Sequence, residues 1–312
     1  MKQMFIPKIE QGPDMTIRSI GRNCRKLERF VGRRASLALL FGAGWLSGCG
    51  GLKTIDTLTP SGGYVADLDI PYGADPRQRL DVYRPAARSS TPAPVVLFLY
   101  GGSWRRGEKE AYRFIGEYLT RMGCVALIAD YRLYPEVQFP AFVEDGASAV
   151  AWARENALSL GGDPRRVYAM GHSAGAHIVV LLALEPRYLA RRGGSPSDLA
   201  GVIGISGPYD QDFSTTRWLR AVFPDTANAA ESRPLTKARA GAPRMLLANG
   251  GRDNLVSPRH AIALATRLRE LGNPVDLRIY EAAGHADILL GLSTNLAGGL
   301  TLGSDVLNFI QG

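Results

Sequence analysis

The chain of 312 residues is long enough for one or two domains with a large buried core, and its contents of 46% hydrophobic and 21% charged residues are typical of a globular protein. The net charge of +8 is unevenly placed: up to residue 48 nine Lys and Arg stand against three Asp and Glu, a net of +6, which leaves about +2 for the rest. A domain with so small an excess of positive charge lacks the electrostatic signature of a nucleic-acid-binding protein, so we exclude nucleic-acid binding.

The first predicted element is a leader over residues 1–48. Its basic part is followed by an uncharged stretch, ASLALLFGAGWL at 35–46, and then by small residues up to Cys49. This order is typical of a signal peptide, and twelve residues are too few to span a bilayer. The four residues LSGC that end at Cys49 resemble the lipobox of bacterial lipoproteins, and this resemblance implies that Cys49 is lipidated and becomes the mature N-terminus.

The leader predicts a location in the bacterial cell envelope, with the protein anchored to a membrane by lipid and facing the periplasm or the exterior. Translation from Met15, a leader cleaved without lipidation and a disordered tail remain open as alternatives. Residues 49–63, rich in Thr, Gly and Ser, are predicted to be a tether between the anchor and a domain over 64–312. Cys124 lies in an apolar run, where a lone thiol is usually a core residue, so we expect no disulfide framework.

Within the domain, strand-like and helix-like patterns alternate. Two strand-like segments, 64–70 and 79–83, come first and are predicted to be antiparallel at the edge of a sheet. The next run is continuously apolar from Val95, as expected of a strand covered on both faces. The later strands are predicted at 92–100, 124–130, 167–170, 202–206, 244–249 and 275–280, and the helices at 112–122, 142–157, 174–184, 260–271 and 302–310. This alternation indicates a mostly parallel, doubly wound sheet flanked by helices, with right-handed crossovers.

One interval, about 208–242, interrupts the alternation. It carries Phe213, Trp218 and Phe223 among polar residues. A segment of this length within a compact domain is usually functional, and its place after a strand predicts a small cap over the carboxyl edge of the sheet. The aromatic residues fit two interpretations, ordinary packing of the insertion onto the domain or an acyl pocket.

The stretch 167–184, VYAMGHSAGAHIVVLLAL, predicts a buried strand, a sharp turn and an apolar helix. At the turn lies a G-x-S-x-G sequence over residues 171–175. Ser173 is therefore predicted to lie at the apex of a nucleophile elbow, with its Oγ exposed above the end of the sheet. Gly171 and Gly175 are explained by the absence of room for a side chain between strand and helix.

A serine hydroxyl needs a base to accept its proton, and the sequence contains four histidines. His172 and His177 lie in and just after the elbow, where they are expected to be packing residues, and His260 begins a surface-like helix. His285 lies in a short Gly-containing loop after the last apolar strand, at the carboxyl edge where the elbow emerges. We therefore predict His285 as the base, with a surface-loop histidine as the alternative.

The acid that orients the base is predicted to be Asp253. It follows the strand before the one that leads to His285, so the two loops are expected side by side on the same edge. Its carboxylate would accept the Nδ1 proton of His285 and fix the tautomer. Asp287 and Asp210 remain rivals, because an aspartate in a Gly-rich turn is often only a turn former.

Donors for an oxyanion are predicted in the loop YGGSW at 100–104, directly after the central apolar strand. Paired glycines let backbone N–H groups approach a ligand without an intervening Cβ, and we predict Gly102 and Ser103 as the donors of this loop, with an ordinary tight loop as the alternative. The N–H of Ala174, at the start of the helix after the elbow, faces the same point.

With these residues in place, the chain from about residue 67 to 310 resembles the α/β-hydrolase fold, and within it the bacterial carboxylesterases related to hormone-sensitive lipase and kynurenine formamidase. That family usually has His before the two glycines, where this chain has Tyr100. Because the side chain at this position helps to hold the loop, the departure affects which backbone N–H groups of the loop serve as donors. The motifs that carry the resemblance are GGSW at 101–104, DYR at 130–132 with YP at 134–135, GDP at 162–164, GHSAG at 171–175, and the pair Asp253 and His285.

The resemblance implies that Ser173 attacks an ester carbonyl, that His285 transfers the proton and that water releases the acyl enzyme. It implies no metal and no cofactor. We therefore expect a lipid-anchored serine esterase for small to medium carboxylic esters, with an arylformamidase-like amidase and a catalytically silent binding protein of the envelope as alternatives. The intact set of three side chains argues against the silent protein.

Overall fold

The sheet at the centre of the molecule is built from strands that are apolar along most of their length. The structure, a computed structural model, describes residues 55–312 except 56, 88 and 225–229. The predicted leader, Cys49 and residues 50–54 and 56 of the predicted tether lie outside the described residues. The strands are β1 (Tyr64–Pro71), β2 (Arg79–Pro85), β3 (Ala93–Leu99), β4 (Val125–Ala129), β5 (Gly162–His172), β6 (Gly201–Ile205), β7 (Met245–Gly250) and β8 (Val275–Tyr280).

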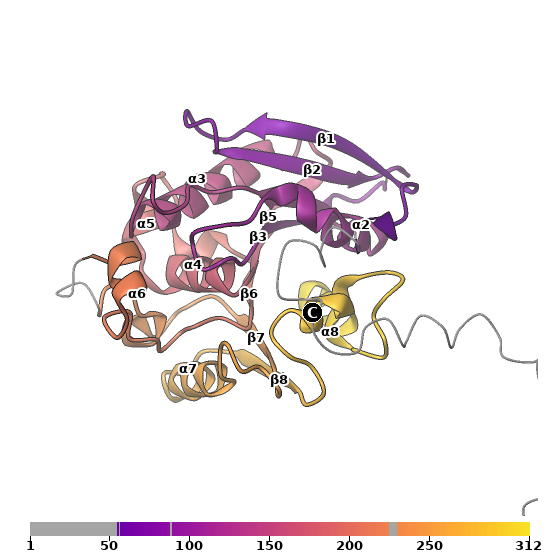
Figure 1. Cartoon of the computed structure of the whole chain (residues 1–312). Helices are drawn as coiled ribbons and strands as arrows, with labels where there is room; N and C mark the ends of the chain where they lie inside the picture. Colours follow the sequence, from indigo (N-terminus) through magenta and orange to yellow (C-terminus); the bar gives the residue numbers. More distant parts are fainter. Residues whose placement is uncertain (1–54, 56, 88, 225–229) are drawn as a thin grey trace, which may run out of the picture. The chain divides into compact units, whose positions relative to one another are not determined.

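These strands form one eight-stranded sheet in the order β1-β2-β4-β3-β5-β6-β7-β8 (Figure 1). β1 pairs antiparallel with β2 and β2 with β4, while every later pair is parallel. The predicted antiparallel edge and the mostly parallel sheet are therefore confirmed. β1, at one edge, has only exposed and half-buried residues, whereas β4, β6 and β7 in the interior are buried at every position.

Helices cover both faces of the sheet, which explains why its inner strands are apolar throughout. α3, α4 and α7 lie on one face and α2 and α8 on the other (Figure 1). All 11 residues of α4 are buried, as expected of a helix that is apolar on all sides. The helices are α2 (Arg113–Arg121), α3 (Ala141–Asn156), α4 (Ala174–Leu184), α5 (Arg187–Ala190), α6 (Arg217–Val222), α7 (Arg259–Glu270) and α8 (Leu302–Gln311), with 3-10 turns η1 (Lys109–Tyr112), η2 (Pro196–Asp198), η4 (Pro234–Lys237) and η5 (Asp287–Leu292).

The interval between β6 and β7 contains α6 and η4. Phe213 and Phe223 are buried, stack on each other with ring centroids 4.0 Å apart, and pack edge-on against Trp104 in the loop after β3. For these two residues the packing interpretation is correct. Trp218 is different, because 42% of it is exposed. The insertion thus rests on the loop at the carboxyl end of β3.

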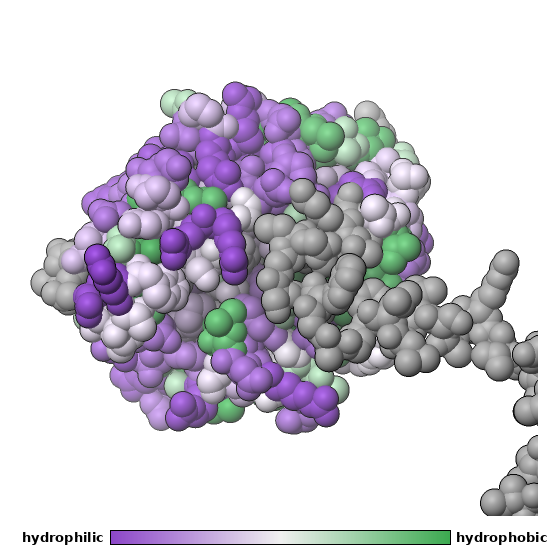
Figure 2. Space-filling model, in the orientation of Figure 1, coloured by the Kyte–Doolittle hydropathy of each residue, from purple (hydrophilic) through white to green (hydrophobic). Residues whose placement is uncertain are grey.

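The surface seen in Figure 2 is mostly hydrophilic, with hydrophobic residues scattered over it. In the part of the chain that the structure describes, no helix is both long and apolar enough to cross a membrane.

Candidate active site

The turn between β5 and α4 has the geometry of a nucleophile elbow. Ser173 has φ 54° and ψ −116°, a conformation that L-residues rarely adopt and that neighbouring structure must hold in place. Its N–H donates to Ile205 O at 2.8 Å. A Cβ at Gly171 would lie 2.4 Å from the carbonyl carbon of Gly175, and a Cβ at Gly175 would lie 2.0 Å from Leu99 O. The predicted reason for both glycines is confirmed, since no side chain fits there.

The loops after β7 and β8 bring Asp253 and His285 to this serine. His285 Nε2 lies 2.9 Å from Ser173 Oγ, and His285 Nδ1 lies 2.8 Å from Asp253 Oδ2. The Asp253 side chain is fully buried and that of His285 is 16% exposed. When Nδ1–H donates to the carboxylate, Nε2 is left with a lone pair that can accept the hydroxyl proton of Ser173. The three residues that the sequence selects thus form one continuous hydrogen-bonded chain.

Asp253 is held rigidly in the loop after β7. Its Oδ1 accepts from the amides of Leu255 at 2.9 Å and Val256 at 2.7 Å. Burial acts to raise the pKa of Asp253, but the hydrogen bond from His285 and those from the two amides outweigh it and hold the pKa below its ordinary value. The carboxylate therefore stays ionised beside the imidazole.

The rival carboxylates have other partners in the described structure. Asp287 accepts from the amide of Gly284 at 2.6 Å, one residue before the base. Asp210 pairs with Arg233, and its amide donates to His260 Nδ1 at 3.1 Å. Neither contacts His285 by a hydrogen bond, so the structure brings only Asp253 to the base.

The loop after β3 passes directly beside the serine. A Cβ on Gly101 would lie 2.8 Å from Ser173 Cβ. Gly102, Ser103 and Trp104 all have positive φ, and the amides of the two following residues close the turn onto Gly102 O. Within the described residues, the amides of Gly102, Ser103 and Ala174 donate to no other group. They remain available for an oxygen atom that develops negative charge near Ser173.

Tyr100 holds the start of this loop. Its hydroxyl donates to Asp130 Oδ1 at 2.5 Å and accepts from Arg77 Nη2 at 2.9 Å. Its ring stacks between Tyr112 and Tyr131, with centroid distances of 5.4 and 4.9 Å, and burial raises its pKa well above the ordinary value. The residue that departs from the resembling family is therefore a protonated donor fixed in a buried network.

His172 and His177 are buried, as expected of packing residues. His177 Nε2 lies 2.6 Å from Ser232 O, and its ring packs edge-on against Trp104. His172 also touches the candidate site, because its Nε2 lies 2.8 Å from the carbonyl oxygen of His285. Burial lowers the pKa of His172 to about 3 and that of His177 to about 4, so both rings are neutral near pH 7.

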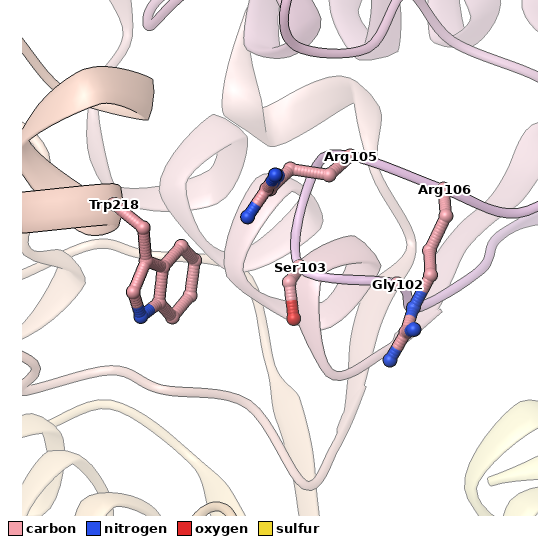
Figure 3. A pocket seen from close by; sticks show the side chains of 5 residues that line it. All are labelled: Gly102, Ser103, Arg105, Arg106 and Trp218. Atoms are coloured by element: carbon pink, nitrogen blue, oxygen red, sulfur yellow. The ribbon is translucent and has the colours of Figure 1, made fainter. Parts of the chain in front are cut away.

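A cavity of about 430 Å³ adjoins the loop after β3 (Figure 3). Sequence reasoning singled out Gly102 and Ser103 from its lining and offered Trp218 as one member of an acyl pocket, but it missed the two arginines. The available signal was the pair of arginines directly after the GGSW sequence. The cavity is lined by Gly102, Ser103, Arg105, Arg106 and Trp218.

No cluster of three or more His, Cys, Asp or Glu among the described residues has the arrangement of a metal site. The arrangement of Ser173, His285 and Asp253 supports nucleophilic attack by the serine on a carbonyl group, with a base, an orienting acid and backbone donors already in place.

Comparison with known proteins identifies relatives of the chain. A family model described as BD-FAE matches residues 80–268. The chain is 33% identical over 254 residues to Esterase LipC of Mycobacterium tuberculosis, covering 74% of this chain and 62% of that protein. It is 31% identical over 243 residues to a probable isoprenylcysteine alpha-carbonyl methylesterase of Oryza sativa subsp. japonica, covering 71% and 57%. The chain thus spans only about three fifths of the length of these two relatives.

Solved structures resemble the chain over most of its length. Thermogutta terrifontis esterase 2 phosphoramylated by tabun has a TM-score of 0.67 and 27% identity, covering 81% of this chain and 97% of that one. A hyperthermophilic esterase from Pyrobaculum calidifontis has a TM-score of 0.69 and 23% identity, covering 83% and 88%. At that lower identity the second structure shows the fold alone.

Proposed function

Because the chain belongs to the BD-FAE family and has the α/β-hydrolase fold, we propose that it is a serine hydrolase that cleaves small to medium carboxylic esters through an acyl enzyme on Ser173. The observation that carries this proposal is the unbroken line from Ser173 Oγ to His285 at 2.9 Å and from His285 to Asp253 at 2.8 Å. A serine that only packs has no need of a base within hydrogen-bond distance.

The geometry assigns each step to one group. Ser173 Oγ attacks the ester carbonyl carbon while its proton moves to His285 Nε2, and the Asp253 carboxylate stabilises the imidazolium that forms. The carbonyl oxygen becomes an oxyanion, which accepts hydrogen bonds from the amides of Gly102, Ser103 and Ala174. The tetrahedral intermediate then expels the alcohol, which takes the proton from His285. Water then attacks the acyl carbonyl carbon while His285 Nε2 takes its proton. The second tetrahedral intermediate breaks its bond to Ser173 Oγ, which regains the proton from His285, and the carboxylic acid is released.

The relatives support an ester as substrate. The two curated relatives are named as an esterase and a probable methylesterase. Thermogutta terrifontis esterase 2 has been captured with propionate and with butyrate bound, which favours short acyl groups for the present chain as well. Phosphoramylation of that esterase by tabun suggests that an organophosphorus reagent would also modify Ser173 here.

We also propose that the protein is a lipoprotein of the cell envelope. The support is the sequence before the described residues: a basic segment, an uncharged stretch and LSGC ending at Cys49. Incorporation of labelled palmitate into the full chain expressed in a bacterium, and loss of the label in Cys49→Ala, is the expected result. Equal labelling of both forms, or of neither, would reject the anchor.

The hydrolase proposal is tested by a fluorophosphonate probe on the protein that lacks the residues before Cys49. We expect the parent to be labelled, Ser173→Ala and His285→Ala to lose labelling, and Ser159→Ala, a matched change at an exposed serine, to keep it. A labelled parent is then assayed on p-nitrophenyl butyrate and on an N-formyl aromatic amide, which separates an esterase from the amidase alternative. A folded parent that neither labels nor hydrolyses contradicts the proposal and favours the binding protein.

A further inference from the structure

The cavity beside the loop after β3 has an unusual chemical character for a pocket that would receive part of a neutral ester. In Figure 3 the guanidinium group of Arg105 extends toward Trp218, while Arg106 lies on the opposite side of Ser103. Both cationic side chains therefore border the cavity of about 430 Å³ that begins at the predicted oxyanion donors.

The positive charge of these two arginines is not neutralised within the described structure. Both side chains are exposed, and neither forms a hydrogen bond or an ion pair there, whereas the half-buried Arg132 lies 2.7 Å from Asp145. None of the residues that line the cavity is acidic. A cavity wall with two uncompensated guanidinium groups raises the local concentration of anions and offers bidentate donors to a carboxylate.

Arg105 is also held in place, as a recognition residue needs to be. Its Cζ lies 5.6 Å from the ring centroid of Tyr134 and 6.0 Å from that of Trp218. The contact with Trp218 joins the loop after β3 to the insertion between β6 and β7, and the contact with Tyr134 joins it to the loop after β4. Both contacts reduce the freedom that an exposed arginine would lose on binding. The exposed indole of Trp218 leaves an apolar surface on which the carbon chain or ring of a substrate can lie.

We propose that this cavity selects esters that carry a carboxylate, with Arg105 and Arg106 as its specificity-determining residues and Trp218 as the surface for the adjoining apolar part. The inference rests on the proposed hydrolase function and names the substrate class of the same site. The carboxylate is placed on the portion of the substrate that extends from the oxyanion donors toward the insertion.

The test compares pairs of substrates that differ in one charge. On the acyl side, the p-nitrophenyl monoester of glutarate is compared with the same compound capped as a methyl ester. On the alcohol side, the butyrate ester of 4-hydroxybenzoate is compared with the butyrate ester of methyl 4-hydroxybenzoate. We expect kcat/KM for the charged member of one pair to exceed that of its neutral partner by about tenfold, and this ratio to fall with added salt.

Variants assign the preference to the cavity. Arg105→Gln and Arg106→Gln should each lower the ratio, and the double variant should lower it by about tenfold or more. Arg192→Gln is the matched control: it removes one positive charge from another exposed arginine without an ion pair in the described structure, and the ratio should not change. A ratio near one in both pairs, or a ratio that Arg192→Gln lowers as much as the cavity variants do, overturns the inference.

A binding measurement separates this inference from the hydrolase proposal. Ser173→Ala cannot form an acyl enzyme, so the charged and neutral esters can be titrated into it by calorimetry without turnover. Tighter binding of the charged member, lost in the double arginine variant, supports the anion pocket even if the parent fails to label with a fluorophosphonate. Equal binding of both members overturns the pocket while leaving the hydrolase proposal to its own test.

Discussion

At the scale of single residues, Tyr100 holds the start of the loop after β3. Its phenol bridges Asp130 and Arg77 at 2.5 and 2.9 Å. Tyr100→Phe keeps the stacked ring and removes only this bridge. We expect the free energy of unfolding to fall by about 1–3 kcal/mol, because a buried carboxylate loses a donor.

Urea denaturation measures this loss. Tyr118→Phe is the control, since the hydroxyl of this half-buried tyrosine makes no hydrogen bond within the described residues. If Tyr100→Phe were as stable as the control variant, the hydrogen bonds of the Tyr100 hydroxyl would contribute nothing to the free energy of unfolding. Hydrolytic activity, measured on the same samples, should fall in Tyr100→Phe because the same network positions the loop of Gly102 and Ser103.

The ring of His172 supports His285, the predicted base, by a hydrogen bond to the backbone carbonyl of His285. The His172 ring is neutral, so it has a single N–H, and the carbonyl oxygen of His285, 2.8 Å from Nε2, accepts that hydrogen. Nδ1 is buried and has no hydrogen-bond partner among the described residues. We expect His172→Ala to lower kcat by about tenfold with little change in KM, because the loop that carries His285 loses its support.

The conservative variant separates this positioning role from simple packing. His172→Gln offers an amide N–H to the same carbonyl and should recover part of kcat, whereas His172→Leu fills the space without a donor and should not. Equal kcat in the glutamine and leucine variants would show that the ring acts by packing alone.

At the scale of elements, the loop after β3 depends on backbone conformations that only glycine adopts readily. Gly102 has φ +139°, and a Cβ there would lie 1.9 Å from Arg106 O. Gly102→Ala should therefore displace the predicted oxyanion donors and lower kcat by about a hundredfold. Gly272→Ala is the control, because this glycine also has positive φ, +78°, but faces open space. Circular dichroism checks that both variants fold; a Gly102→Ala enzyme with parental kcat would contradict the assignment of the loop.

The sequence predicted those elements whose pattern is dictated by burial. Strands β3, β4, β6 and β7 appear as unbroken apolar runs because helices cover both faces of the sheet, and the elbow follows from a strand joined to an apolar helix. β5 is longer than predicted, since it begins at Gly162 with the polar residues of the GDP sequence. The six-residue helix α6 was not predicted, because it is too short for a helical period to emerge.

The limits of sequence reasoning lie at contacts between distant segments. Ser173, Asp253 and His285 could be selected because each follows a strand, and carboxyl ends of parallel strands share one edge. Arg105 lies in the loop after β3 and Trp218 in the insertion between β6 and β7. Their contact could not be predicted in the same way, because the pairing of the strands does not fix where these two segments meet. Side-chain direction, which decides whether an arginine borders a cavity or meets only solvent, leaves no trace in the hydrophobic pattern.

At the scale of the whole molecule, buried neutral histidines make the stability of the fold depend on pH. Burial lowers the pKa of His172 to about 3 and of His177 to about 4, against an ordinary value of about 6.5 in the unfolded chain. Between pH 6.5 and 4 the unfolded chain therefore binds protons that the folded chain does not. The stability these two groups contribute is present above pH 6.5 and declines as the pH falls through that window, by up to about 1.4 kcal/mol per pH unit for each histidine.

The urea midpoint should therefore fall steeply from pH 7 to pH 4. In His177→Gln the midpoint should fall less steeply, because only His172 of the two buried histidines remains to contribute to the pH dependence. Glutamine is chosen because its amide can still donate to Ser232 O, the partner 2.6 Å from His177 Nε2, so the loss at pH 7 is kept small. The diagnostic quantity is the difference in unfolding free energy between parent and variant, which should shift in favour of the variant as the pH falls from 6.5 to 4. A difference that stays constant across that range would mean that His177 is already protonated in the folded protein or reaches solvent when it titrates, and the pH sensitivity of the fold would then arise elsewhere.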